Sequence, residues 1–334
     1  MRAAVWERPG ELQIAERPDP QPAANEIVVR VGACGMCGTD VHIAQGEFPP
    51  TQYPIVPGHE FAGEVVSVGS EVEDLAVGAH VAVDPSLFCG HCDFCRVQRG
   101  NLCRNWNAIG DTVDGAFAEL VKAPARNAYA LPEGTSARAG ALVEPLACAV
   151  HGMRRLEPDT GDSVLVTGAG TMGLLLLQLL HQGGAASVSV VDRNERRLEL
   201  ASSLGATQVE TEVQAAVDGN GDGFDCVVDA TGVPPVVQQG LEAVRRGGKL
   251  MVFGVAPEEA RVQVSPFRIY NDEITLIGSM AVLYTFVQAI ELLRSGTIQT
   301  EPLLTHTFPL EEFEAALEAM RAGEGLKVQV LPNS

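Results

Sequence analysis

From about residue 146 to residue 280, short apolar segments alternate with segments that have the periodicity of helices. This alternation is typical of a parallel sheet wrapped by helices. It therefore predicts a doubly wound α/β domain in the middle of the chain. The expected strands lie at 162–168, 187–192, 224–232, 249–255 and 274–279, and the clearest helices at 173–182 and 194–205.

A glycine-rich turn follows the first of these strands. The pattern G-x-G-x-x-G is matched by Gly168-Ala-Gly170-Thr171-Met172-Gly173, which ends a predicted strand and opens a predicted helix. A dinucleotide-binding turn requires this context. Gly168 permits the tight turn, Gly170 lets the backbone approach a pyrophosphate, and Gly173 allows close packing of helix on strand. The phosphates would lie at the amino end of the helix.

The second predicted strand ends at Asp192, 19 residues after Gly173. A carboxylate there would accept hydrogen bonds from both ribose hydroxyls and repel a 2′-phosphate, which favours NAD over NADP. Arg193 and Arg197 point the other way, because a nearby arginine can accommodate that phosphate. A structural interpretation stays open, in which the glycines only pack and Asp192 caps a helix.

The first 145 residues consist of short, valine-rich alternating segments between glycine and proline turns. Strands of this length predict an antiparallel barrel or sandwich that carries function on its loops; they are expected at 26–31, 61–69, 79–84 and 116–124. After residue 280, two amphipathic helices and two strands form a tail too short to be a domain. We expect domains at 1–145 and 146–280, and a segment, 281–334, that returns to the first domain.

The stretch 31–60 is expected to be an extended loop held by four prolines. It contains Cys37, His59 and Glu60. A thiolate, an imidazole and a carboxylate suit a catalytic zinc, which keeps one position open for water or substrate. Taken singly, each of these residues is better explained as a structural one, such as a buried cysteine or a satisfied core histidine.

Four cysteines crowd into residues 89–103, with the spacing C-x2-C-x2-C-x7-C formed by Cys89, Cys92, Cys95 and Cys103. Four thiolates so close in sequence can close a tetrahedral shell, which indicates a structural zinc. An iron–sulfur cluster uses similar ligands. His91 is expected to be a bystander, since four sulfurs suffice.

Charge and composition exclude several classes of partner. A formal net charge of −20 argues against binding to nucleic acid or to an anionic membrane surface. The densest apolar run, residues 174–180, is too short to span a bilayer. The amino end lacks the apolar core of a signal peptide. We therefore expect a cytoplasmic protein whose eight cysteines are metal ligands or buried thiols.

Taken in order, these motifs resemble those of the zinc-dependent medium-chain dehydrogenases, in particular the polyol (sorbitol-type) branch, which also holds threonine and butanediol dehydrogenases. The resemblance rests on CGTDVH (37–42), PGHEFAGEVVSVG (57–69), the four cysteines, EPLACAVHG (144–152), GAGTMG (168–173) and VVD (190–192). It implies a GroES-like catalytic domain, built from both ends of the chain, around a Rossmann domain. It also implies a homodimer or homotetramer.

The resemblance implies that Cys37, His59 and Glu60 approach the catalytic zinc. Glu144 would stand where classical alcohol dehydrogenases carry a cysteine ligand, touching the metal directly or through its water; from its own segment alone, a first-turn or capping carboxylate is as good an interpretation. A harder, more anionic ligand set should suit a substrate that chelates zinc through vicinal oxygens. Ala281 stands where sorbitol dehydrogenases carry a substrate-binding arginine. This departure disfavours sorbitol itself and leaves other polyols, sugar alcohols or a vicinal diol.

The implied reaction is oxidation of a secondary alcohol to a ketone with NAD as hydride acceptor. Zinc would lower the pKa of the alcohol. Thr39 would accept its proton and pass it, by way of the cofactor ribose, towards His42. Asp40 is expected to hold the second ring nitrogen of His59. In the structural alternatives, Thr39 caps a helix that has Asp40 in its first turn, and His42 is a surface residue.

Two other functions compete with this one. A zinc-free reductase of the quinone reductase branch would lack the set of Cys37, His59 and Glu60. A non-enzymatic NAD-binding scaffold would have no need of intact ligands. Both alternatives are therefore disfavoured relative to an enzyme acting on a small-molecule alcohol.

Overall fold

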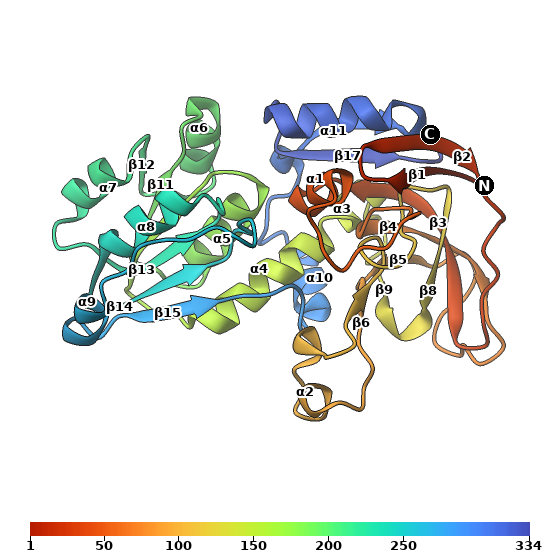
Figure 1. Cartoon of the computed structure of the whole chain (residues 1–334), viewed down its shortest axis with the longest axis horizontal. Helices are drawn as coiled ribbons and strands as arrows, with labels where there is room; N and C mark the ends of the chain where they lie inside the picture. The colour runs from red at the N-terminus through yellow and green to blue at the C-terminus, as the bar shows by residue number, and fades with distance from the viewer. The chain divides into compact units, whose positions relative to one another are not determined.

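A computed structural model describes residues 1–334 of the chain, which divide into two compact units (Figure 1). Unit 1 consists of Met1–Ala147, Val282–Arg294 and Thr300–Ser334, and unit 2 consists of Cys148–Ala281 and Ser295–Gln299. The boundaries expected after residues 145 and 280 lie within two residues of these divisions. The short piece at 295–299, which belongs with unit 2, was not anticipated.

Unit 2 is built on a six-stranded sheet whose order is β12-β11-β10-β13-β14-β15, and every neighbouring pair is parallel. In chain order this is 3-2-1-4-5-6, the doubly wound arrangement, so the predicted α/β class is confirmed. The strands are β10 (Ser163–Thr167), β11 (Ser187–Val191), β12 (Gln208–Glu210), β13 (Phe224–Asp229), β14 (Val244–Val252) and β15 (Thr275–Gly278). Only β12, three residues with no apolar run, was not predicted.

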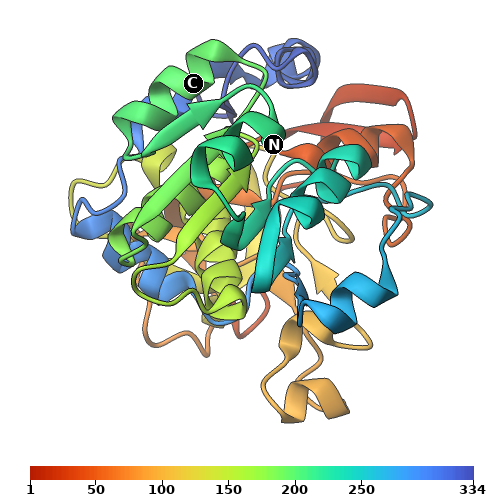
Figure 2. The same ribbon diagram turned by 90° about the vertical axis from the view of Figure 1, so that its left-hand side faces the viewer.

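Helices cover this sheet (Figure 2). They are α4 (Val143–Leu156), whose first residues belong to unit 1, α5 (Thr171–Gln182), α6 (Glu195–Ser203), α7 (Val213–Asn220), α8 (Pro234–Ala243) and α9 (Pro266–Asn271). The apolar run at 174–180 is buried along its whole length in α5, which explains its composition. No helix of the chain combines the length and the apolar character needed to cross a membrane.

Unit 1 is mainly antiparallel, as predicted. Its seven-stranded sheet has the order β16-β17-β3-β4-β5-β9, with β8 also paired to β3. Its strands are β3 (Glu26–Gly35), β4 (Glu60–Val68), β5 (His80–Val83), β8 (Leu120–Pro124), β9 (Ala128–Ala130), β16 (Leu304–Pro309) and β17 (Lys327–Leu331). Val29, Phe61, Val81 and Phe117 lie in its buried core.

Smaller elements complete unit 1. They are the hairpin of β1 (Arg2–Arg8) and β2 (Glu11–Glu16), the pair β6 (Ser86–Leu87) and β7 (Asn107–Ala108), and the helices α1 (Gly38–Gln45), α2 (Asp93–Arg96), α3 (Ala137–Gly140), α10 (Phe286–Arg294) and α11 (Phe313–Ala322).

The prediction of an extended loop over 31–60 is wrong for its first half. β3 continues to Gly35, and α1 follows at once. Helix α1 begins because the Cys37 side chain and the Asp40 carboxylate form a reciprocal capping box. It ends at Gly46, whose φ of 76° is the left-handed conformation of a helix C-terminus.

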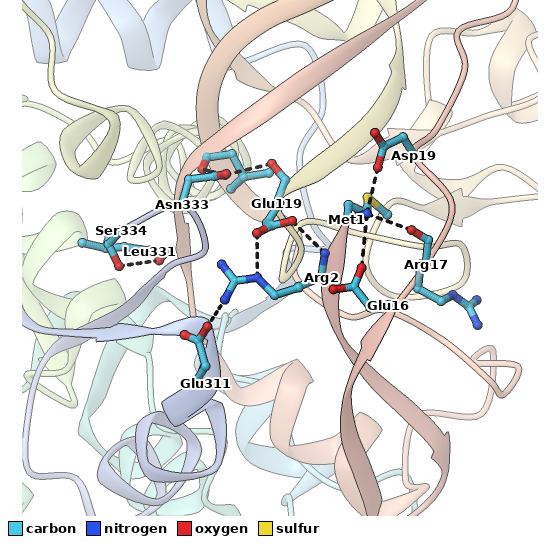
Figure 3. A network of polar contacts seen from close by, with 11 residues as sticks. Met1, Arg2, Glu16, Arg17, Asp19, Glu119, Glu311, Leu331, Asn333 and Ser334 are labelled. Atoms are coloured by element: carbon cyan, nitrogen blue, oxygen red, sulfur yellow. Dashed lines mark hydrogen bonds and ion pairs between the residues drawn. The ribbon is translucent and has the colours of Figure 1, made fainter.

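Both chain ends are fastened within unit 1 (Figure 3). Arg2 binds the Glu119 carboxylate at 2.7 Å and also pairs with Glu311, close to α11. Near the carboxyl end, the Asn333 side chain donates to the main-chain oxygens of Glu119 and Val31 at 2.9 Å. The carboxyl-terminal segment thus joins the strands of the first 145 residues, as the sequence predicts.

Inside unit 1, Lys327 of β17 forms a buried ion pair with Glu60 of β4. Lys327 Nζ lies 2.5 Å from Glu60 Oε2, and the two side chains are 4% and 3% exposed. Lys327 Nζ also donates to the Met36 carbonyl at 3.0 Å. A Cβ at Gly35 would lie 2.2 Å from Glu60 Oε2, so glycine leaves the room that this carboxylate occupies. Burial opposes the charge of Lys327, but Glu60 and neighbouring anions keep its pKa above the usual value.

Replacing Lys327 with methionine should destabilise unit 1, because it leaves the Glu60 carboxylate buried without its partner. Breaking a buried pair from one side costs about 3–5 kcal/mol. The double variant Lys327→Met/Glu60→Gln should recover much of this loss. Urea unfolding of the single and double variants measures both effects. A single variant as stable as the parent protein would contradict the structural role of the pair.

Candidate metal and nucleotide sites

Three side chains of unit 1 converge near the start of α1. One ligand atom each of Cys37, Asp40 and His59 lies within 4.8 Å of the other two. Cys37 Sγ and His59 Nε2 are 3.0 Å apart. Sulfur and nitrogen bound to one tetrahedral zinc would lie about 3.6 Å apart. A small movement of the two side chains away from each other would therefore make room for the ion.

The Asp40 carboxylate supplies a second indication of a cation. Its Oδ2 accepts a hydrogen bond from the Cys37 backbone N–H at 2.9 Å, whereas its buried Oδ1 has no hydrogen-bond partner. Burial is the main reason why the pKa of Asp40 rises to about 7. A buried carboxylate oxygen without a donor calls for an explanation, and a bound cation provides one.

The second ring nitrogen of His59 lies beside the Asp111 carboxylate, at the place where Asp40 was expected. His59 Nδ1 lies 2.8 Å from Asp111 Oδ1, although the ring N–H does not point directly along this contact. Burial alone would lower the pKa of His59, but Asp111 and Cys37 raise it well above its usual value. Asp40 does not fill this role because its carboxylate caps α1.

The two glutamates predicted to approach the metal lie elsewhere. The Glu60 carboxylate is bound to Lys327, as described above, and does not join the group of Cys37, Asp40 and His59. Glu144 is buried in the first turn of α4 and is also outside that group. Their contact with a metal stays a prediction.

The two residues of the predicted proton path both lie on α1. Thr39 is in its first turn, and its backbone N–H donates to Cys37 Sγ at 3.3 Å. His42 follows on the same helix, partly exposed, with Nδ1 3.0 Å from Glu47 Oε2. The alternative of Thr39 as the helix cap is wrong, because Cys37 caps α1; Asp40 lies in the first turn, as that alternative expected.

The four cysteines of residues 89–103 form a second cluster, with all sulfurs within 4.8 Å of one another. The separations are 3.5 Å for Cys92–Cys95, 3.9 Å for Cys92–Cys103 and 4.0 Å for Cys89–Cys95. Sulfurs around one tetrahedral zinc would be about 3.8 Å apart. The donor set and its spacing therefore fit a structural zinc.

The surroundings of these cysteines lower the pKa of Cys89 and Cys92 through backbone donors, whereas burial raises the pKa of Cys95 to about 12. The backbone N–H groups of Cys89 and Asn105 donate to Cys103 Sγ at 3.4 and 3.3 Å. A hydrogen bond from the His91 backbone is the main reason why the pKa of Cys89 falls to about 6. The His91 ring instead bonds to the Cys89 carbonyl at 2.9 Å. All eight cysteines of the chain are free of disulfides.

In unit 2, the glycine turn has the geometry that each predicted role requires. Gly168 has a φ of 98°, which other residues rarely adopt. A Cβ at Gly173 would lie 1.8 Å from the Gly168 carbonyl, so close helix–strand packing demands glycine there. A Cβ at Gly170 would meet no atom within 4 Å, which leaves open space over the turn. Thr171 and Met172 begin α5, whose amino end faces this turn.

Asp192 connects the glycine turn to the start of α6. Its Oδ2 accepts the Ala169 N–H at 2.7 Å, and its Oδ1 accepts the Asn194 N–H at 2.9 Å. The residue that caps α6 is Asn194. Since a carboxylate has about four lone-pair sites, Asp192 retains capacity for ribose hydroxyls. Arg193 is exposed beside it, and Arg197 lies in the first turn of α6.

Comparison with known proteins gives two family matches. The alcohol dehydrogenase GroES-like domain matches residues 23–133, and the zinc-binding dehydrogenase domain matches residues 171–295. The chain is 38% identical to D-arabinitol dehydrogenase 1 of Uromyces fabae, covering 100% of this chain and 97% of that protein. It is 33% identical to L-threonine 3-dehydrogenase of Shewanella halifaxensis, with 98% of each covered.

Solved structures give the same result. A Sinorhizobium meliloti protein described as a zinc-binding dehydrogenase, bound to NADP, matches with a TM-score of 0.95 at 34% identity. An Escherichia coli alcohol dehydrogenase with NADH matches with a TM-score of 0.92 at 31% identity. Each comparison covers 99% of both chains. A 2R,3R-butanediol dehydrogenase of Bacillus subtilis has 0.90 at 29% identity, again with 99% of each chain covered. The chain belongs to the zinc-dependent medium-chain dehydrogenases, enzymes that act on CH–OH donors.

Proposed function

We propose that this enzyme oxidises a secondary alcohol of a polyol, sugar alcohol or vicinal diol to the ketone, reversibly, with NAD as hydride acceptor. The observation that carries the proposal is the convergence of Cys37 Sγ, His59 Nε2 and a carboxylate oxygen of Asp40 within one small group of ligand atoms. The similarity to an arabinitol dehydrogenase and a butanediol dehydrogenase supports this substrate class.

The metal that fits this place is zinc, held by Cys37 and His59 with a carboxylate nearby. Zinc bound there would lower the pKa of the substrate hydroxyl. Asp40 is the carboxylate within reach of both ligands. Glu60 and Glu144 remain our predicted alternatives, and Glu60 would have to leave Lys327 to serve as a ligand. A second zinc is proposed for the four cysteines, where it would stabilise the fold of residues 89–103.

We assign proton transfer to α1. Thr39 would accept the substrate proton through its hydroxyl. His42 would receive that proton at the partly exposed end of the path. His42 Nδ1 lies 3.0 Å from Glu47 Oε2 at that end. In unit 2, the Asp192 carboxylate would bind the adenosine ribose and disfavour a 2′-phosphate, which is our reason for proposing NAD.

A second candidate substrate is L-threonine. The match to several L-threonine 3-dehydrogenases at 32–35% identity favours it. Threonine also presents two neighbouring polar groups to a metal, a hydroxyl and an amine. The two candidates share the chemistry of oxidation at a secondary alcohol and differ in the substrate that is accepted.

The first test is a kinetic screen of four- to six-carbon polyols, short diols and L-threonine, each with NAD and NADP. We expect oxidation of a polyol or diol with a higher kcat/KM for NAD than for NADP. His59→Ala should abolish turnover and lower the zinc content while leaving NAD binding intact. The matched control is His80→Ala, which changes an exposed histidine of β5. Turnover by His59→Ala at the parent rate would contradict the metal site, and turnover of L-threonine alone would replace the substrate class.

The second test concerns Thr39. Thr39→Val keeps the size of the side chain and removes the hydroxyl, so kcat should fall by about 10²-fold or more. Zinc content and NAD affinity should stay unchanged, and Thr39→Ser should restore most of the rate. A valine variant with unaltered kcat over a pH series would show that the hydroxyl carries no proton.

The third test concerns the four cysteines. Cys92→Ser should lower the zinc content by about one ion per chain and reduce the melting temperature, because a structural zinc contributes to folding. Cys148→Ser, the same substitution on α4 outside both clusters, serves as the control and should keep both zinc ions. An unchanged zinc content in Cys92→Ser would mean that this cluster binds no metal.

We also propose a cytoplasmic homotetramer or homodimer. Eight cysteines without a disulfide agree with a reducing compartment. Sedimentation equilibrium of the purified enzyme distinguishes two subunits from four.

A further inference from the structure

Asp111 lies outside every motif that identifies the metal site, yet it contacts one of the proposed ligands. Its Oδ1 is 2.8 Å from His59 Nδ1, and the side chains of His59 and Asp111 are only 8% and 11% exposed. The opposite ring nitrogen, Nε2, faces Cys37 Sγ at 3.0 Å. An imidazole that binds a metal through one nitrogen directs the proton of the other to an acceptor, which fixes the tautomer and the ring orientation.

The fold brings Asp111 to His59 through contacts between glycines. Gly110 has a φ of 88°, and a Cβ there would lie 2.2 Å from the Gly58 carbonyl. A Cβ at Gly115 would lie 2.4 Å from the same oxygen. Without side chains at these two positions, residues 110–115 can lie directly on the backbone that precedes His59.

Hydrogen bonds then fasten this loop in place. Ala116 N–H donates to the Gly58 carbonyl at 2.9 Å, and Gly115 N–H donates to the Val56 carbonyl at 2.7 Å. The Thr51 hydroxyl donates to the Asp111 carbonyl at 2.7 Å. The position of Asp111 beside His59 is therefore determined by backbone contacts on both sides of the loop.

The two buried aspartates near His59 have different partners. Asp40 accepts the Cys37 N–H, and one of its carboxylate oxygens lies within 4.8 Å of ligand atoms of Cys37 and His59. Asp111 is absent from that group and meets the far nitrogen of the ring. One carboxylate thus stands on the metal side of His59 and the other behind it.

We propose that Asp111 is the positioning residue of the metal centre, holding His59 by Nδ1 so that Nε2 is presented to the ion together with Cys37 Sγ. The inference rests on the proposed function, because it presupposes a metal at Cys37 and His59. A negative charge behind the ring also makes the imidazole a more basic ligand.

The test compares Asp111→Asn with Asp114→Asn. Asp114 lies on the same loop, but its carboxylate accepts the Val56 N–H at 2.9 Å and does not contact His59. Asparagine at 114 keeps an acceptor oxygen. Both variants are prepared as full chains, and the affinity of each for Zn²⁺ is measured by competition with a chromogenic chelator. The bound zinc is then replaced by Co²⁺, and the visible absorption spectrum of the Co²⁺ protein is recorded.

Loss of such an orienting partner typically weakens metal affinity by about 10–100-fold. We expect this loss at one site of Asp111→Asn, with a shifted Co²⁺ spectrum, and no change in Asp114→Asn. Parent-like affinity and spectrum in Asp111→Asn would overturn the inference. Equal losses in both variants would also overturn it, since they would indicate a general effect of the loop. If the His59→Ala variant binds as much zinc as the parent protein, the proposed metal centre itself is wrong. This result is separable from the other two.

Discussion

The buried negative charge around His59 is the constraint on which the catalytic half of this molecule depends. Asp40, Glu60 and Asp111 are all nearly inaccessible to solvent, and Cys37 adds a thiol that a metal would ionise. Burying so many acidic groups is costly unless cations accompany them. Lys327 neutralises Glu60. The remaining charge is what a divalent ion between Cys37 and His59 would balance.

The fold supplies each part of this arrangement from a different place in the chain. A capping box at the start of α1 provides Cys37 and Asp40, and the residue before β4 provides His59. The last strand, β17, carries Lys327, so the carboxyl-terminal segment completes the site as well as the sheet. Unit 2 contains the candidate nucleotide site, a glycine turn whose Ala169 N–H donates to the Asp192 carboxylate. Its conformational requirements are met at Gly168 and Gly173.

Features that are encoded locally could be predicted from the sequence. The parallel strands of unit 2 other than β12 contain short apolar runs, and the four-cysteine cluster has a spacing short enough to be recognised without a structure. Helix α1 was missed because its signal is a single capping box, Cys37 with Asp40, beside a proline-rich stretch. The pattern of cysteine, two residues and aspartate, followed by Gly46, was the available clue.

Contacts between distant residues could not be predicted. Glu60 and Lys327 are 267 positions apart, and no periodicity connects them. The family resemblance implies that Glu60 approaches the metal, but it gives no sign of the ion pair that the Glu60 carboxylate forms with Lys327. Asp40 was expected to be the partner of His59, but the carboxylate beside Nδ1 belongs to Asp111. Asp111 reaches the ring only because Gly110 and Gly115 let its loop approach Gly58.

The most direct test of the central claim is anomalous X-ray scattering from crystals of the purified enzyme, recorded on both sides of the zinc absorption edge. We predict a peak between Cys37 Sγ and His59 Nε2, next to Asp40, and a second peak among the four sulfurs of residues 89–103. A zinc-replete crystal with a peak only at the four cysteines, or with the Cys37 and His59 side chains turned apart, would contradict the account.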